Sequence, residues 1–331
     1  MRWPCASSCS THASNCAVAS VFRLVTCEHC SRVMPSNSVG TGCRDGVAIR
    51  RMTTASNPHL VHLEHQLRCL QLVHEFGAMR MQTIAYAMFP KKTPSAAYAA
   101  AKRAVRDAGG KEYLVYGRQP NSNRYYALTL RGARKLHSLD DSRDVHSTTS
   151  ALEFRRLEHR EWCNIVALSS RHRGLRSYSE MQIRGTANSE LMDVFKHRPD
   201  ALTYYVDARR KACVAWHEVD LSRRSTSDKK RLAHLVHTLI EQRFLTHEKQ
   251  EHDINLVMHC RTAKIQRENH ALIGAVLAKY PGELLSGPEA YQLTIGEGKD
   301  ARVFQVDINE LSAAIEGVWG SSLPWPEAPG K

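Results

Sequence analysis

The stretch RPDALTYYVDARRKACVAWHEVDL, residues 198–221, contains two runs of strand-forming residues on either side of a polar turn. β-Branched and aromatic residues around such a turn predict a hairpin, with strands over Ala201–Val206 and Lys211–Leu221. We expect the chain to reverse at Ala208-Arg209. The hairpin then brings the two ends of the stretch, both of which carry acids, to the same end of a sheet.

Three acids flank this hairpin. Folding sets Asp200 roughly opposite His217, and depending on the register of the turn Asp200 lies beside Glu218. Since side chains alternate along a strand, Glu218 and Asp220 share one face and His217 lies on the other. We therefore expect Asp200, Glu218 and Asp220 to converge near one end of the sheet.

Such a group of carboxylates predicts a metal site. Neighbouring carboxylates repel unless a cation lies among them, and hard oxygen ligands suit Mg²⁺ or Mn²⁺. The expected ligands are Asp200, Glu218 and Asp220. Phosphodiester hydrolysis is then the natural chemistry, because the metal polarises a phosphoryl oxygen and lowers the pKa of a bound water. An acidic turn on a solvated hairpin is the open alternative.

The composition is that of a globular protein with room for about two domains. Of its 331 residues, 42% are hydrophobic and 24% are charged. No run of about 18 apolar residues occurs, so we expect no membrane span. Four cysteines in apolar surroundings are typical of reduced thiols, which predicts a cytoplasmic location: Cys69, Cys163, Cys213 and Cys260.

The net charge of +13 favours a polyanionic partner, and its distribution is uneven. Residues 52–140 carry 13 Lys and Arg against 5 Asp and Glu, whereas residues 141–331 carry 27 against 26. This asymmetry predicts a basic binding module joined to a nearly neutral second domain.

The N-terminal region differs from the rest of the chain. The first 51 residues are rich in Ser, Thr and Cys, poor in acids, and hold six of the ten cysteines. Half a zinc site at Cys27-Glu28-His29-Cys30 with Cys43, a disulfide framework and a transit peptide are open alternatives. We favour a disordered or mis-assigned extension over residues 1–57, with Met52 as the start of the folded protein.

Two helices are expected first. Apolar residues recur at three- and four-residue spacing and predict a core-facing stripe: Leu60, Leu63, Leu67, Leu70 and Val73. Gly77 is expected to end this amphipathic helix. A short second helix over Met81–Phe89 stops before Pro90.

A third helix has clear boundaries. Thr93 is the expected N-cap, Pro94 takes the first helical position, and Gly109-Gly110 closes the helix. One face carries small residues suited to close packing: Ala97, Ala101, Ala104, Val105 and Ala108. The opposite face carries Ser95, Tyr98, Lys102 and Arg106.

Two strands follow, over Tyr113–Tyr116 and Arg124–Leu128, and a closing helix is expected over Leu130–Leu139. The order helix, helix, helix, hairpin is that of a winged helix-turn-helix, in which the third helix enters the major groove of double-stranded DNA. Residues 58–139 would form this domain. Six residues are expected to face the DNA: Tyr98, Lys102, Arg103, Arg106, Arg118 and Arg124. Ordinary exposed charges are the alternative.

A polar linker is expected over residues 140–150, a second domain over residues 151–320 and a tail over residues 321–331. Outside the hairpin, helices are expected over Ala151–Ser170, Asp228–Phe244, Thr262–Tyr280 and Asn309–Val318. Strands are expected over Ser177–Ile183, Ile254–Cys260, Tyr291–Ile295 and Val303–Val306. Helix, three strands, helix and strand predict an α/β layered domain, so the chain as a whole is expected to be α+β.

Pro199-Asp200 on one strand and Glu218-x-Asp220 on the next, between two helices, resemble the PD-(D/E)XK nuclease superfamily with its restriction-endonuclease-like fold. More narrowly, three segments after a winged helix are similar to the replication-relaxation family of plasmids and other mobile elements. They are Leu157-Glu158-His159-Arg160, Arg198-Pro199-Asp200-Ala201-Leu202 and Glu218-Val219-Asp220. The resemblance covers roughly residues 60–280.

The resemblance implies a DNA-binding protein that acts in replication, relaxation or mobilisation of such an element, alongside its replication or relaxation proteins. It implies that Asp200 and Glu218 bind a metal ion and that Glu158 is the catalytic acid of the first helix. Asp220 departs from the superfamily pattern, which usually has a lysine that supports the attacking water or the developing phosphorane charge. A cation displaced in sequence could replace it, and four residues are candidates: Arg223, Arg224, Lys229 and Lys230.

Two hypotheses therefore stay open. One is a Mg²⁺-dependent DNA nickase or endonuclease, and the other is a non-catalytic DNA-binding regulator or replication accessory factor with a degenerate nuclease domain. No phosphate loop of the G-x-x-x-x-G-K-[ST] type occurs, which argues against an ATP-driven helicase. Whether the protein forms a homodimer is also open.

Overall fold

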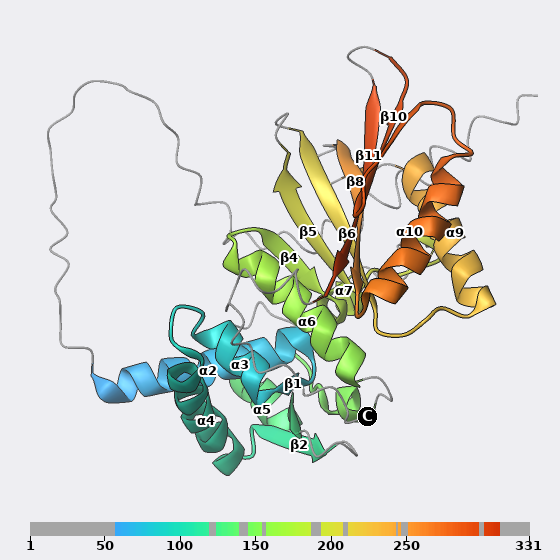
Figure 1. Cartoon of the computed structure of the whole chain (residues 1–331). Coiled ribbons are helices and arrows are strands. Elements are labelled where there is room, and N and C mark those ends of the chain that lie inside the picture. Colours follow the sequence, from blue (N-terminus) through green and yellow to red (C-terminus); the bar gives the residue numbers. More distant parts are fainter. Residues whose placement is uncertain are drawn as a thin grey trace, which may run out of the picture.

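The computed structural model describes residues 57–118, 124–138, 145–153, 157–186, 193–207, 211–242, 244–245, 251–297 and 301–311. A helical part with a small sheet comes first along the chain, and a larger part built on one mixed sheet follows it (Figure 1). The α/β class expected from the sequence is confirmed at this level. Residues 1–56 and 321–331, expected as extension and tail, lie outside the described residues.

The helical part begins with α2 (Pro58–Phe76), β1 (Met79–Arg80), α3 (Met81–Met88) and α4 (Pro94–Gly110). It continues with β2 (Leu114–Arg118), β3 (Arg124–Leu128) and α5 (Leu130–His137). The three strands pair in the order β1-β3-β2. The expected order of helices and hairpin is therefore present, with β1 as an addition, because two residues are too few for a periodic signal.

Helix α2 ends at Gly77, as expected, and the φ of +80° at this glycine is a conformation that other residues rarely adopt. The expected core stripe along this helix is wrong for its first turns. Leu60 and Leu63 are 64% and 42% exposed, whereas Leu70 and Val73 are fully buried. The buried residues of α2 begin at Gln66, so periodicity alone overstated the buried face.

Helix α4 has the expected faces. Thr93 is the N-cap residue and Pro94 the first helical residue. The small residues of the predicted stripe are all buried, and their short side chains let α4 pack closely on α2 and α3. The opposite face is open to solvent.

The larger part is built on a sheet with the strand order β4-β5-β6-β8-β11-β10-β9, and β7 pairs with β8. Its first four strands are β4 (Arg176–Ser179), β5 (Ala201–Val206), β6 (Ala212–Asp220) and β7 (Phe244–Leu245). The others are β8 (Glu251–Cys260), β9 (Glu283–Ser286), β10 (Ala290–Ile295) and β11 (Arg302–Glu310). β6, β8 and β11 are parallel, and the remaining pairs are antiparallel.

Helices cover both faces of this sheet and make three layers (Figure 1). Helix α6 (Leu157–His172) lies on one face, while α9 (Thr226–Glu241) and α10 (Ala263–Leu277) lie on the other. Alternation along β6 separates the two cores, since Val219 packs with residues of α6 and Trp216 packs with residues of α9 and α10. A capping box between Ser225 and Asp228 starts α9.

Three sequence expectations for this part are wrong. The helix expected over Asp228–Phe244 ends at Glu241, and Phe244 belongs to β7. The strand expected over Ser177–Ile183 stops at Ser179, and α7 (Glu180–Thr186) begins directly after it. The side chain of Ser179 accepts from the backbone N–H of Gln182, a local bond typical of a helix start. The helix expected near Asn309–Val318 is also wrong at its start, because β11 pairs with β8 as far as Glu310. Residues 312–318 lie outside the described residues.

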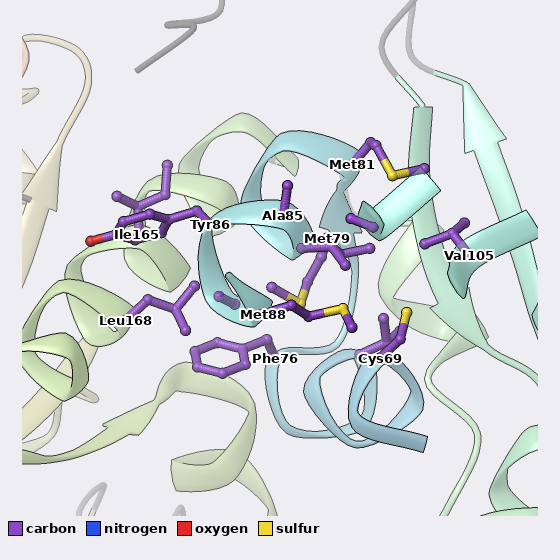
Figure 2. Close-up of a cluster of buried hydrophobic side chains, with 14 of the residues drawn as sticks. Cys69, Phe76, Met79, Met81, Ala85, Tyr86, Met88, Val105, Ile165 and Leu168 are labelled. Atoms are coloured by element: carbon purple, nitrogen blue, oxygen red, sulfur yellow. The ribbon is translucent and has the colours of Figure 1, made fainter. Parts of the chain in front are cut away.

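The two parts share a hydrophobic core. Figure 2 shows Ile165 and Leu168 of α6 beside Phe76, Tyr86 and Met88 of the helical part, and all five side chains are buried. Because dense packing joins the parts, we expect them to unfold together.

Polar contacts reinforce this junction. The Asn164 amide donates to the carbonyl oxygens of Phe76 and Ala78, both at 3.3 Å. The carboxylate of Glu161 accepts from Thr83 Oγ1 and from the Arg80 N–H. Burial is the largest influence on Glu161 and raises its pKa, although these hydrogen bonds oppose the shift.

The described end of the expected linker is packed into the structure. Thr148 is fully buried, and its hydroxyl donates to the Gly77 carbonyl oxygen and accepts from the Leu128 N–H. The short 3₁₀ helix η2 (Thr149–Glu153) follows it and contacts β3. The polar residue Thr148 of the expected linker therefore bonds to the backbone of Leu128 and Gly77. None of the helices of the described residues has the length and apolar character that crossing a membrane requires.

Candidate functional site

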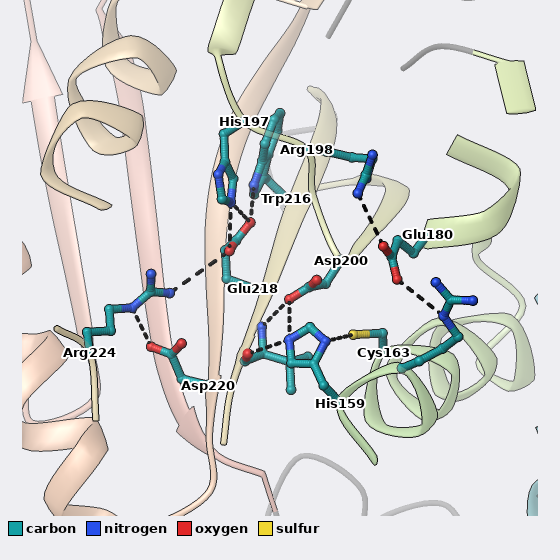
Figure 3. Close-up of polar contacts among 12 residues, drawn as sticks. His159, Cys163, Glu180, His197, Arg198, Asp200, Trp216, Glu218, Asp220 and Arg224 are labelled. Carbon is teal, nitrogen blue, oxygen red and sulfur yellow. Dashed lines mark hydrogen bonds and ion pairs between the residues drawn. The ribbon is translucent and has the colours of Figure 1, made fainter. Parts of the chain in front are cut away.

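Strand register places three acids in one row. Ser179 pairs with Ala201 and Ala201 pairs with His217, so the residues one step beyond, Glu180, Asp200 and Glu218, are neighbours at the same end of β4, β5 and β6. Ala201, not Asp200, is thus opposite His217. Of the two positions expected for Asp200, the structure has the one beside Glu218. We call Glu180, Asp200 and Glu218 the acidic row (Figure 3).

Asp200 is held by backbone and by α6. Its N–H donates to the His217 carbonyl oxygen at 3.0 Å, and its Oδ2 accepts from the Val219 N–H at 2.8 Å. His159 Nε2 lies 3.4 Å from the same oxygen. Burial opposes ionisation of Asp200, but the charge of His159 and these hydrogen bonds outweigh it and lower the pKa of Asp200.

His159 is correspondingly basic. Burial lowers its pKa, yet the charge of Asp200 and hydrogen bonds to Asp200 and the Val219 carbonyl raise it to about 9. The ring and the carboxylate therefore form a charged pair at neutral pH. In the sequence, His159 stands out only as part of the segment Leu157-Glu158-His159-Arg160. Its pairing with Asp200 could not be predicted, because the two residues are 41 positions apart and no local pattern links them.

Glu218 is almost fully engaged. His197 Nε2 lies 3.1 Å from both of its carboxylate oxygens, and Trp216 Nε1 donates to Oε1 at 2.8 Å (Figure 3). Burial lowers the pKa of His197, but the neighbouring Glu218 outweighs it and the pKa is raised. His197 comes from the segment before β5, which the sequence did not mark as functional.

Asp220 lies on the same strand face as Glu218 but has different partners. Arg224 Nε donates to its Oδ2 at 2.6 Å, and the Asn269 amide donates to the same oxygen at 2.7 Å. Arg224 Nη2 also lies 4.0 Å from Glu218 Oε2. Of the four candidate replacement cations, Arg224 is the one paired with these acids, whereas Arg223 pairs with Glu268.

Glu180 completes the row from α7 and is surrounded by arginines. Its carboxylate lies 2.7 Å from Arg184, 3.3 Å from Arg198 and 3.7 Å from Arg160. Glu180 is not expected as a site residue from the sequence, because it lies within the strand expected over Ser177–Ile183. The signal that could have found it is Arg184, which stands four residues later at helical ion-pair spacing.

The other expected catalytic acid lies elsewhere. Glu158 pairs with Arg261 at 3.5 Å, beyond the end of β8, and the hydrogen bonds and ion pairs of the described residues do not join it to Asp200 or Glu218. His217 points away from Glu218, as expected: its ring contacts Thr203 Oγ1 at 2.9 Å and His259 Nε2 at 3.0 Å on the opposite face.

Each carboxylate of this region has its own basic partner. Glu180 has three arginines, Asp200 has His159, Glu218 has His197, and Asp220 has Arg224. These side chains supply positive charge where the sequence predicts a metal ion. An ion entering the row must therefore displace or share at least one of these pairs.

A second candidate site is the exposed face of α4. Tyr98, Lys102, Arg103 and Arg106 are all exposed there. Arg124, on the neighbouring hairpin, is exposed and lies 5.0 Å from the ring centre of Tyr116. The backbone of Arg118 ends β2, but its side chain lies outside the described residues. The structure thus places five of the six expected DNA-facing side chains in solvent.

Comparison of the chain with protein-family models, with curated proteins and with solved structures finds no match.

Proposed function

We propose that this chain is a DNA-binding protein of a plasmid or other mobile element, in which the helical part is a winged helix-turn-helix. The observation that carries the proposal is the exposed basic face of α4 beside the β2–β3 hairpin. The strand β1 before α3 supports it, because it completes a small sheet that fixes the hairpin next to α4. The DNA contacts proposed are Tyr98, Lys102, Arg103, Arg106, Arg118 and Arg124.

We propose that the larger part is a nuclease-like domain. Helix α6, strands β4, β5 and β6, helix α9 and strand β8 follow the order expected from the resemblance, with α7 inserted after β4. Asp200 and Glu218 are neighbours at the end of two paired strands, which is where the resemblance requires its metal-binding acids. Replication, relaxation or mobilisation of the element would be the process served.

The donor atoms fit a magnesium ion in part. Asp200 uses Oδ2 to accept from the Val219 N–H, and Oδ1 lies outside that bond, whereas both oxygens of Glu218 are bonded to His197. Asp200 and Glu218 would hold the ion, which would supply polarisation of a phosphoryl oxygen and a more acidic bound water. Arg224 would take the place of the missing lysine, since it brings a fixed positive charge to Glu218 and Asp220.

A specific observation favours the second candidate, a non-catalytic accessory factor. Every carboxylate of the region is already matched by a basic side chain, and Asp220 stands where the superfamily has lysine. Acids neutralised in this way need no metal ion to balance their charge. On this alternative the larger part serves for contacts with DNA or with replication proteins.

Nicking of supercoiled plasmid with and without Mg²⁺ separates the candidates. The nickase predicts Mg²⁺-dependent relaxed circles with wild type, and loss of nicking in Asp200→Asn and in Glu218→Gln. Glu268→Gln is the matched control, because this acid is half-buried and pairs with Arg223 outside the row. Nicking that persists in both row variants would reject the site, and tight DNA binding by wild type without any cleavage would favour the accessory factor.

A further inference from the structure

A different set of ligand atoms lies beside the acidic row. One ligand atom each from His159, Cys163 and Asp200 lie within 4.8 Å of one another. His159 and Cys163 are four residues apart on α6, so they project from one face of the helix toward the strand end that carries Asp200 (Figure 3). Nitrogen, sulfur and oxygen donors thus meet at one point.

Hydrogen bonding orients the imidazole of His159. Its Nε2 lies 3.0 Å from the Val219 carbonyl oxygen, which can only accept, so Nε2 carries a proton. Nδ1 is then the nitrogen that can bind an ion, and it faces Cys163 Sγ at 3.4 Å. Metal-binding histidines usually donate their other N–H to a backbone carbonyl or a carboxylate, and His159 has both next to Nε2.

The spacing suits a tetrahedral ion. Zinc bonds of about 2.0–2.1 Å to nitrogen and about 2.3 Å to sulfur place the two donor atoms about 3.6 Å apart. The observed 3.4 Å between Nδ1 and Sγ is close to this value. The side chains of His159 and Asp200 are 26% and 15% exposed, which leaves an open direction for a water as the fourth ligand.

We propose that His159 Nδ1, Cys163 Sγ and Asp200 Oδ1 bind a zinc-type divalent ion, with water in the fourth position. Imidazole and thiolate ligands select zinc over magnesium, which prefers oxygen ligands alone. At neutral pH the charged ring of His159 also carries a proton on Nδ1. On binding, the ion replaces this proton and the thiol proton, and both leave to solvent.

Asp200 is a ligand of the proposed zinc site and also belongs to the acidic row. Bound zinc would therefore compete with magnesium for Asp200 and lower any magnesium-dependent activity of the row. This consequence rests on the proposed nuclease function, whereas zinc binding itself does not.

A cysteine nucleophile is the competing interpretation of the same three residues. Sγ of Cys163 belongs to a fully buried side chain, so a substrate has no access to it. A buried thiol that faces an oriented imidazole fits metal binding better than nucleophilic attack.

The test is a metal titration of the full chain after removal of metal with a chelator. Co²⁺ is the probe, because its thiolate complexes absorb in the near ultraviolet, and Zn²⁺ is then added to displace it. Residues 1–51 hold six further cysteines that can also bind metal, so the measured quantity is the number of equivalents lost in each variant. Wild type is expected to bind one more equivalent of Co²⁺ than Cys163→Ala does. Added Zn²⁺ is expected to displace this additional equivalent.

Cys69→Ala is the matched control, since this cysteine is equally buried in α2 and is expected to leave the count unchanged. His159→Gln, at a more exposed position, should weaken the same equivalent by more than the about 10–100-fold that loss of an outer-shell partner costs. Equal counts and equal thiolate absorption in wild type, Cys163→Ala and His159→Gln would overturn the site, and so would an equal loss in Cys69→Ala. If wild type does not cleave DNA, only the nuclease proposal is affected, because the number of bound Co²⁺ equivalents does not depend on cleavage.

Discussion

Arg224 Nε lies 2.6 Å from Asp220 Oδ2, and the same guanidinium reaches to 4.0 Å from Glu218 Oε2. The side chain of Arg224 is only 13% exposed, so this positive charge is placed among acids that are largely shielded from water. Asp220 near the end of β6 is thus faced by a cation four residues later in the chain. Arg224 therefore joins two neighbouring acids of one strand face.

Removing Arg224 should destabilise the protein strongly. Arg224→Met leaves Asp220 and Glu218 without this cation, and breaking a buried ion pair on one side costs about 3–5 kcal/mol of unfolding free energy. Urea unfolding followed by circular dichroism measures the loss. Arg223→Met is the control, because its pair with Glu268 is exposed and should matter little. Equal losses in the two variants would contradict the importance of the buried pair, and Asp220→Asn added to Arg224→Met should recover part of the loss.

The exposed face of α4 should carry DNA affinity. Lys102→Ala with Arg106→Ala removes two positive charges, and each lost phosphate contact flattens the dependence of log K on log salt by about 0.9. Binding to duplex DNA, measured by fluorescence anisotropy at several salt concentrations, gives this slope. Lys211→Ala with Lys279→Ala removes two exposed charges from the larger part and should leave the slope unchanged. If both pairs of substitutions act alike, DNA binding is a matter of total charge and α4 has no special role.

Glu161 should make stability depend on pH. Its folded pKa is raised by burial, so the folded state holds a proton that the unfolded state has lost above about pH 4.5. The stabilisation is complete below the unfolded pKa and is lost as pH rises through that value toward the raised folded pKa. Glu161→Gln mimics the protonated form and removes this dependence. The unfolding free energy of wild type minus that of the variant should fall as pH rises above 4.5, and a constant difference would contradict the assignment.

Local sequence signals predicted the secondary structure where they were dense. Pro94 and the small-residue stripe define α4, and alternation in β6 places Glu218 and His217 on opposite faces, as observed. Isolated signals failed: Leu60 has helical spacing but is 64% exposed, and Glu180 follows a strand of only four residues. Periodicity identifies the face of a segment that could be buried. Whether that face is buried depends on which other elements pack against it.

The site could be predicted only in part for the same reason. Asp200 and Glu218 belong to one hairpin, so sequence proximity and register bring them together. The residues that neutralise them come from other elements: His159 from α6, His197 from the segment before β5, and Arg224 from the turn before α9. Their positions depend on packing of helices across the sheet, which no short motif encodes.

Thr148 should be a critical residue of the junction between the two parts. Thr148→Val keeps the shape of the side chain but leaves the Leu128 N–H and the Gly77 carbonyl without their partner. A buried polar group left unsatisfied costs about 1–3 kcal/mol, so the unfolding free energy should fall by at least that amount. Thr148→Ser retains the hydroxyl and should lose clearly less. Because the parts share one core, circular dichroism and tryptophan fluorescence should give one coincident transition for wild type and both variants. Two of the five tryptophans, Trp162 and Trp216, are buried in the larger part and contribute to this fluorescence. Two separate transitions in wild type, or equal stability of the valine and serine variants, would contradict this account of the junction.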